Sequence, residues 1–252
     1  MTLRSVFPIQ QLLSAAACGL FLLAGAANGQ DVIIKQDGTQ QLGKIMGSSA
    51  AGIQIQIGTG SMITIPMAQA KEARMGAVPP EFALAQKAAE QKQYDAELTQ
   101  LKALEKYKGL PAEWAQQAAG MIGDVYLDKG DIPKAEAAYA EYQKLYPGGV
   151  QADLGLAKLA VAKKDFATAK AKVEPIIAKA NEEKNPSRVN GFAYSQAFLL
   201  MGQIKESENA PEEALADYLK AVTIFYYDRN AATLAQEKAD ALRKANPNVF
   251  IP

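Results

Sequence analysis

The sequence predicts an α+β protein in separate domains, a small β barrel followed by a larger, mainly all-α solenoid of helical hairpins. Between Asp31 and Met75 apolar residues alternate with polar ones, which is the pattern of strands with one buried face. From Glu81 onward apolar residues recur every three or four positions, as in amphipathic helices. Short breaks containing Gly, Asp or Pro divide this second part into paired segments that resemble one another.

Residues 1–29 have the layout of a secretory signal peptide. Arg4 is the only charged residue in this segment, and an apolar stretch over 12–27 is followed by small residues that suit signal peptidase. We expect cleavage after Gly29 or Ala27. The apolar stretch is shorter than the roughly 20 residues of a spanning helix. An uncleaved anchor is therefore the weaker alternative, and we expect no membrane span once the signal is removed.

The composition of the mature chain indicates where it is exported to. The single cysteine, Cys18, lies within the predicted signal peptide, so the mature chain has no disulfide. It also lacks an Asn-x-Ser/Thr acceptor with a permitted middle residue. Small secreted eukaryotic domains usually depend on disulfides. Both absences favour the bacterial cell envelope, with a periplasmic location.

Residues 30–76 are predicted to form the β module. Asp37-Gly38 and the segment 58–60 are turn signals. They separate five expected strands, at 31–36, 41–48, 52–58, 61–66 and 70–75. The run from Asp31 to Gly38, followed by Leu42-Gly43-Lys44-Ile45 and Ile65-Pro66, resembles SH3-like or Sm-like barrels. That resemblance implies a docking or spacer module. The segment has no basic patch, so we do not expect nucleic-acid binding.

A proline-containing segment separates the two parts. Residues 77–80 end in Pro79-Pro80, and a residue that precedes a proline is disfavoured in helices. We therefore expect a stiff hinge over 77–80, with the helical region occupying 81–247 and a short tail at 248–252.

The strongest internal signal is a repeated helical hairpin, whose middle copy is marked by Ile122-Gly123, Tyr126, Gly130, Ala135, Tyr139 and Pro147. This spacing resembles the tetratricopeptide repeat (TPR), in which small residues permit close helix crossing and aromatics fill the space between hairpins. Ala169 follows Ala135 by 34 residues, the length of one such repeat.

The resemblance implies four hairpins and a closing helix. A later copy has Lys205 in place of the first-helix aromatic, and the first copy has Glu97 in place of the crossing alanine. Terminal copies are expected to be atypical. We expect a longer loop from Asn181 to Gly191. The expected boundaries are 81–108, 112–147, 150–180 and 191–227 for the hairpins and 231–245 for the closing helix.

In the TPR family the first helix of each hairpin lines a concave face that binds peptides or protein segments. The residues carried over to that face by position are Gln117, Asp124, Leu127, Gln151, Lys158, Val161, Gln196, Leu199, Gln203 and Glu206. The set is mostly polar and lacks the Lys, Asn and Arg cluster that clamps a peptide carboxylate in some members. A solvated face without a ligand is an equally good explanation for any single one of these residues.

The composition removes the usual starting points for catalysis. There is no histidine, and 27 basic residues balance 27 acidic ones. Serine, cysteine and metal sites that depend on histidine or thiol groups therefore cannot be built in the mature chain. We expect no catalytic residues, no metal site and no cofactor.

Two functions from different classes remain. The leading one is a non-catalytic protein–protein interaction scaffold or assembly factor of the cell envelope that binds a protein partner on the concave face. The alternative is a cell-wall or polysaccharide-binding protein that acts through the β module. Sugar binding usually employs exposed aromatics, and the segment from Asp31 to Met75 has no Trp, Tyr or Phe. The sequence therefore favours the scaffold.

Overall fold

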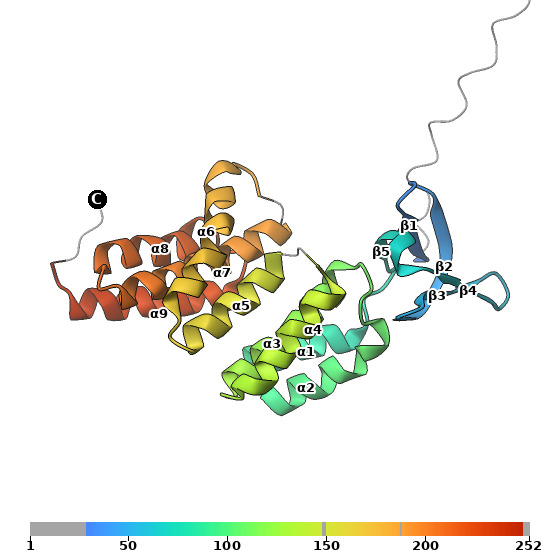
Figure 1. Cartoon of the computed structure of the whole chain (residues 1–252), viewed down its shortest axis with the longest axis horizontal. Helices are drawn as coiled ribbons and strands as arrows, with labels where there is room; N and C mark the ends of the chain where they lie inside the picture. The colour runs from blue at the N-terminus through green and yellow to red at the C-terminus, as the bar shows by residue number, and fades with distance from the viewer. Residues whose placement is uncertain (1–28, 148–149, 187, 249–252) are drawn as a thin grey trace, which may run out of the picture.

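The computed structural model describes residues 29–147, 150–186 and 188–248. Within them a five-stranded antiparallel sheet is followed by nine α-helices, so the chain has an α+β arrangement, as predicted. Figure 1 shows the sheet at one end of an elongated molecule and the last helices at the other. The predicted signal peptide, apart from Gly29, and the tail residues 249–252 lie outside the described residues.

The sheet has the order β4-β3-β2-β1-β5, with β4 and β5 at its edges. Every strand begins and ends within one residue of the expected positions. Alternation places Ile33, Ile45 and Ile55 on a single buried face, while Gln54 points to solvent. The strands are β1 Asp31–Lys35, β2 Gln40–Ser49, β3 Gly52–Ile57, β4 Ser61–Ile65 and β5 Ala70–Arg74.

The helices follow as four pairs and a closing helix. Short 3-10 turns occur at Met67–Gln69 (η2) and Glu105–Tyr107 (η3). The α-helices are α1 Pro80–Glu90, α2 Tyr94–Ala103, α3 Glu113–Asp128, α4 Ile132–Leu145, α5 Val150–Ala162, α6 Phe166–Glu182, α7 Arg188–Ser207, α8 Pro211–Thr223 and α9 Arg229–Ala245.

The same turn joins the two helices of each pair. One residue at the turn has a positive φ, and the next residue donates its backbone N–H to the carbonyl five positions earlier. This geometry ends a helix in a left-handed residue, a conformation that glycine adopts most easily. The left-handed residues are Lys92, Gly130, Lys164 and Asn209. Four pairs therefore share one local design, although only one turn uses glycine.

Consecutive pairs interlock through a tyrosine ring. Tyr139 of α4 is buried against Gly123 of α3 and Gly155 of α5. A Cβ atom at Gly123 would lie 2.3 Å from the Tyr139 ring, and one at Gly155 would lie 2.5 Å from it. Such distances are far below van der Waals contact, so both positions require glycine for the ring to fit. Tyr218 of α8 repeats the arrangement against Gly202 of α7.

The sheet, the first helix pair and α3 share one hydrophobic core. Ile45 and Ile55 of the sheet belong to the same buried cluster as Leu101 of α2 and Trp114 of α3. A Cβ atom at Gly47 of β2 would lie 2.6 Å from the carbonyl oxygen of Lys106, so the two parts make backbone contact. The expected hinge at 77–80 thus joins two parts that pack together, and its last residue already belongs to α1.

Two backbone carbonyls between α2 and α3 also bind the sheet. Ser48 Oγ donates to the carbonyl of Lys108 at 2.7 Å, and the Ala73 N–H donates to the carbonyl of Pro111 at 2.8 Å. These bonds satisfy polar groups that the contact would otherwise leave without water.

A second core joins α5 to α9 and includes Phe198, Tyr218 and Ala235. The expected loop from Asn181 to Gly191 is largely wrong, because α6 continues to Glu182 and α7 begins at Arg188. The inserted residues lengthen these two helices instead. Among the described residues, none of the helices combines the length and apolar character needed to cross a membrane.

Candidate functional site

The ten residues predicted for the concave face all lie on first helices of pairs, on α3, α5 and α7. Seven of them are half-buried and Glu206 is exposed. Gln196 and Leu199 differ from the others because they are buried. The remaining eight are Gln117, Asp124, Leu127, Gln151, Lys158, Val161, Gln203 and Glu206, and we call their surface the first-helix face.

Asp124 and Lys158 form an ion pair across two consecutive helix pairs. Lys158 Nζ lies 2.9 Å from each carboxylate oxygen of Asp124, and the two residues are 34 positions apart. The Tyr139 hydroxyl donates to Asp124 Oδ1 at 2.6 Å. Burial and the adjacent negative charge of Asp124 raise the pKa of Tyr139 above its ordinary value, so its hydroxyl keeps its proton. Asp124 is therefore held by groups from α4 and α5.

Glu97 of α2 occupies the position at which the second helix of a pair crosses the first. In each of the four pairs, the residue at this position donates its backbone N–H to the carbonyl four positions earlier, which belongs to the residue just after the left-handed one. The equivalent residues, Ala135, Ala169 and Ala214, are all completely buried. A glutamate therefore stands where the other three pairs bury a methyl group.

The carboxyl group of Glu97 has an unfavourable environment for a charge. Glu97 is 4% exposed, and its carboxylate has no hydrogen bond or ion pair with any residue that the structure describes. Burial, followed by the negative charges of Asp124 and Asp128, raises the pKa of Glu97 to about 7. We call Glu97, Asp124 and Asp128 the acidic cluster.

Asp128 lies at the exposed edge of the acidic cluster. Partial desolvation of its carboxyl group and the charge of Asp124 raise the pKa of Asp128, while Lys158 and Lys92 act in the opposite direction. Lys158 thus contributes to both aspartates, although its ammonium group bonds only to Asp124. Of the three carboxyl groups in the cluster, only that of Asp124 has a bonded cation among the described residues.

A second feature of the first-helix face is an open hollow of about 460 Å³ near α7. Within it, Glu206 Oε2 accepts a hydrogen bond from the Tyr218 hydroxyl at 2.7 Å and lies 3.8 Å from Lys238 Nζ of α9. Its wall is therefore partly apolar and partly charged. We call this cavity the α7 hollow. It is lined by Val161, Phe166, Gln203, Glu206, Ser207 and Lys238.

Gln196 and Leu199 have structural roles. Gln196 Nε2 donates to Asp228 Oδ2 at 2.7 Å, and Asp228 Oδ1 accepts the N–H groups of Asn230 and Ala231 at the start of α9. This interaction fixes the first turn of the closing helix. Leu199 packs in the core that α9 helps to close. Position within a repeat could not reveal this, because only the last pair is covered by an additional helix.

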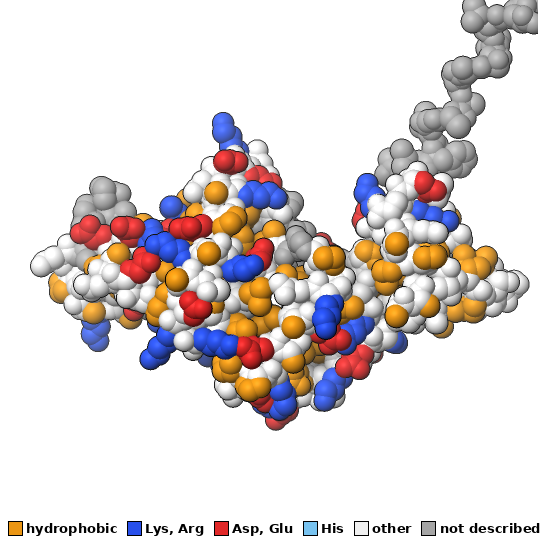
Figure 2. Space-filling model, in the orientation of Figure 1, with side chains coloured by type: hydrophobic (Ala, Val, Ile, Leu, Met, Phe, Trp, Pro, Cys, Tyr) orange, Lys and Arg blue, Asp and Glu red, His pale blue; other side chains and the backbone are white. Residues whose placement is uncertain are grey.

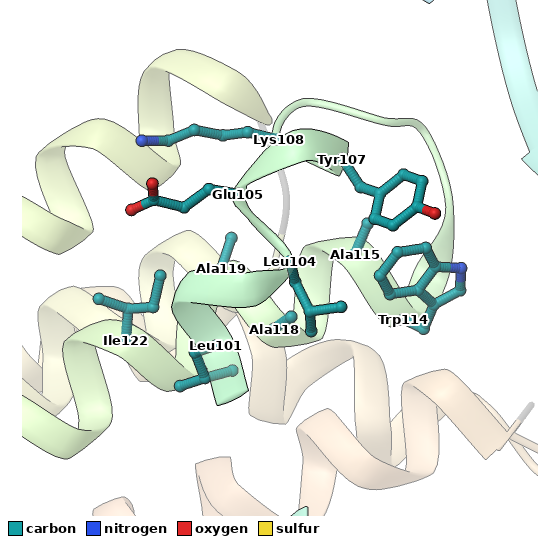
Figure 3. Close-up of a pocket in the computed structure, with 10 residues that line it drawn as sticks. All are labelled: Leu101, Leu104, Glu105, Tyr107, Lys108, Trp114, Ala115, Ala118, Ala119 and Ile122. Carbon is teal, nitrogen blue, oxygen red and sulfur yellow. The ribbon is translucent and has the colours of Figure 1, made fainter. Parts of the chain in front are cut away.

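A small cavity of about 30 Å³ lies between α2, η3 and α3 (Figure 3). The rings of Tyr107 and Trp114 lie on one side of it, with their centroids 5.3 Å apart, and Glu105 points away from them. The buried Trp114 Nε1 has no hydrogen-bond acceptor among the described residues. The cavity has room for about one water molecule. It is packing space within the core.

The sheet presents a surface of different character. Lys44 is the only charged residue between Gln40 and Met67. Figure 2 shows mostly hydrophobic and uncharged groups on the sheet and mixed charges over the helices. The large apolar side chains that are exposed here are Leu42, Met46 and Met62.

The sequence reasoning identified Asp124, Lys158, Val161, Gln203 and Glu206 as face residues, and these residues form the ion pair and part of the α7 hollow. It did not assign a binding role to Glu97 or Asp128. The available signal was the break in the alanine pattern at Glu97. Phe166, Ser207 and Lys238 come from three different helices, and only the folded chain brings them together.

Among the described residues no group of three or more His, Cys, Asp or Glu side chains is arranged to hold a metal ion. Comparison of the sequence with known protein families finds no matching family, and comparison with curated proteins finds no match either.

Proposed function

We propose that this chain is a non-catalytic scaffold or assembly factor of the bacterial cell envelope that binds a protein partner on its first-helix face. In this proposal residues 1–29 direct export to the periplasm. Helices α1–α9 form a TPR-like solenoid, and the sheet forms an SH3-like or Sm-like barrel that packs against its first pair. The partner binds without a cofactor.

The observation that carries this proposal is the fourfold recurrence of one turn geometry between paired helices. Stacked pairs of this kind present their first helices side by side, which produces an extended surface suited to a polypeptide segment. The half-buried polar residues of that surface and the α7 hollow support the same assignment. The absence of histidine from the sequence supports a non-catalytic role.

The test is a crosslinking pull-down from envelope extracts of the source cells, with residues 30–252 as bait. A matched variant, Ser207→Arg, places a long cationic side chain in the α7 hollow. Ser207 is exposed and its hydroxyl bonds only to the carbonyl of Ile204 in its own helix, so the fold should persist. Thr99→Arg is the control, because Thr99 is also exposed and bonds to a carbonyl of its own helix, on α2.

The proposal expects a protein that is captured by the unmodified bait and by Thr99→Arg, and lost or much reduced with Ser207→Arg. Circular dichroism must show that both variants are folded. Equal capture by all three baits removes the α7 hollow from the binding surface. Retention of glycan with no specific protein contradicts the scaffold function and favours the polysaccharide-binding alternative.

A further inference from the structure

Glu97 is the least expected side chain in the helical region. A glutamate with no partner is buried at a position where three equivalent residues are alanine. Burial of an ionisable group without a partner opposes folding. The repeat tolerates a methyl group at this position, so packing does not require a carboxylate. The geometry therefore points to a ligand that is absent from the free chain.

The charged groups around Glu97 come from several elements. Asp124 and Asp128 face it from α3, while Lys92 and Lys158 act on Asp128 from the first turn and from α5. On its own helix Asp95 binds Lys129 at 2.5 Å. Asp124 is neutralised by Lys158 and the Tyr139 hydroxyl. Within the acidic cluster this leaves Glu97 and Asp128 as the two carboxylates without a bonded cation among the described residues.

We propose that the acidic cluster is a binding site for one cationic side chain, a guanidinium or ammonium group presented by the protein partner. This inference rests on the proposed function and deepens it, because it states the chemistry by which the partner is recognised. The exposed Asp128 forms the entrance, and the buried Glu97 lies behind it.

A guanidinium group suits the cluster for a geometric reason. Its five N–H donors lie in a plane and can bond to two carboxylates at once. The incoming charge also compensates for the partial loss of hydration of the Glu97 carboxyl group. Since the pKa of Glu97 is about 7, this carboxyl group is partly protonated at neutral pH, and a bound cation favours release of the proton. Binding at this site is therefore coupled to deprotonation of Glu97.

The probe is a fluorescent peptide of alternating glycine and arginine, compared with the same peptide in which citrulline replaces arginine. Citrulline keeps the shape of the side chain and removes its charge. Fluorescence anisotropy measures the affinity of residues 30–252 at pH 8 and low salt. The test variants are Glu97→Gln and Asp128→Asn, and Glu212→Gln is the control because it removes one exposed carboxylate from α8.

We expect the arginine peptide to bind the unmodified protein and the Glu212→Gln variant with equal affinity. Glu97→Gln and Asp128→Asn should each weaken binding about tenfold, since each removes one partner of a partly desolvated charge pair. Equal binding of the citrulline peptide, or unchanged binding by Glu97→Gln, overturns the proposal.

Calorimetry in two buffers of different ionisation enthalpy gives a second readout. At pH 7 the unmodified protein should release a fraction of a proton when the arginine peptide binds, and Glu97→Gln should release less. No difference between them contradicts the coupling to Glu97.

The pull-down separates this inference from the proposed function. If an envelope protein is captured equally by the unmodified and Glu97→Gln baits, the scaffold function stands and the proposed binding of a cationic side chain at the acidic cluster fails. If the arginine peptide binds at the acidic cluster and no envelope protein is captured, the cation site stands and the scaffold function fails.

Discussion

Lys205 Nζ lies 3.2 Å from Asp217 Oδ2, and Asp217 is almost completely buried in α8. Lys205 occupies the position that Tyr126 occupies in the earlier pair, and Asp217 replaces Ala138 there. Lys205 also binds Glu213 at 2.9 Å. Two departures from the repeat pattern therefore compensate for each other, which explains how a lysine can stand at an aromatic position.

This pair predicts strong coupling between two substitutions. Lys205→Met should lower the free energy of unfolding by about 2 kcal/mol or more, because it leaves the buried Asp217 carboxylate without its closest cation. Asp217→Ala in the same chain should recover most of that loss. A double-mutant cycle measured by urea denaturation checks this. Additive effects would show that the two residues act independently.

The glycines around the Tyr139 ring should not tolerate a side chain. Gly155→Ala brings a Cβ atom to 2.5 Å from the ring, and we expect a loss of about 2 kcal/mol from the resulting repacking. Gly120→Ala is the matched control on α3, since its Cβ would lie 3.9 Å from Tyr142. The control should be neutral or stabilising by up to about 1 kcal/mol through helix propensity. Thermal unfolding of both variants tests the difference.

The left-handed residues at the turns between paired helices predict that two substitutions change the free energy of unfolding in opposite directions. Lys164 has a φ of 61°, so Lys164→Gly should raise the free energy of unfolding by about 0.5 to 1 kcal/mol. Gly130 has a φ of 74°, and Gly130→Ala should lower it by about 1 kcal/mol. If both substitutions change stability in the same direction, the backbone conformation at these turns is not the cause.

Glu97 predicts a distinctive dependence of stability on pH. Its folded-state pKa of about 7 lies above the ordinary value of 4.5, so the folded chain holds the proton more tightly than the unfolded chain. The stabilisation that the folded chain gains from binding this proton more tightly is therefore fully present below about pH 4.5. It is lost as the pH rises through about 7. Glu97→Gln should remove at most about 3 kcal/mol of this pH-dependent change between pH 4.5 and 8.

Urea denaturation at several pH values gives the measurement. Asp128, whose pKa is also raised, should keep a smaller dependence of the same sign in the Glu97→Gln variant. Asp95→Asn is the contrasting control, because Lys129 lowers the pKa of Asp95. The contribution of Asp95 to stability is present at neutral pH and is lost on acidification, so its pH dependence has the opposite sign to that of Glu97.

Local patterns were enough to predict the five strands and the paired helices, since alternation and helical spacing reflect burial directly. Asn181 to Gly191 was predicted as a loop because it interrupts the repeat spacing. The chain lengthens α6 and α7 instead, and no local signal distinguishes these outcomes. Leu199 was assigned to an exposed face because repeat position does not show that α9 completes the core around it.

The acidic cluster was only partly predictable. Asp124 was identified by its position on a first helix, and Glu97 was identified as an exception to the alanine pattern. Their proximity depends on how closely α2 packs against α3, which sequence spacing does not give. The α7 hollow depends in the same way on α9, since Lys238 reaches it from a helix that belongs to no pair.

The core that the sheet shares with the first helix pair has a consequence for the ends of the molecule. A stack of helix pairs exposes an apolar end unless a terminal unit covers it. Here Leu101 and Trp114 belong to the same buried cluster as the sheet residues at one end, and Leu199 belongs to the same cluster as residues of α9 at the other. A chain shortened to begin at Pro80 would expose this apolar end to water and should aggregate. The sheet is thus an end cap of the helical stack, and the two regions depend on each other to remain soluble.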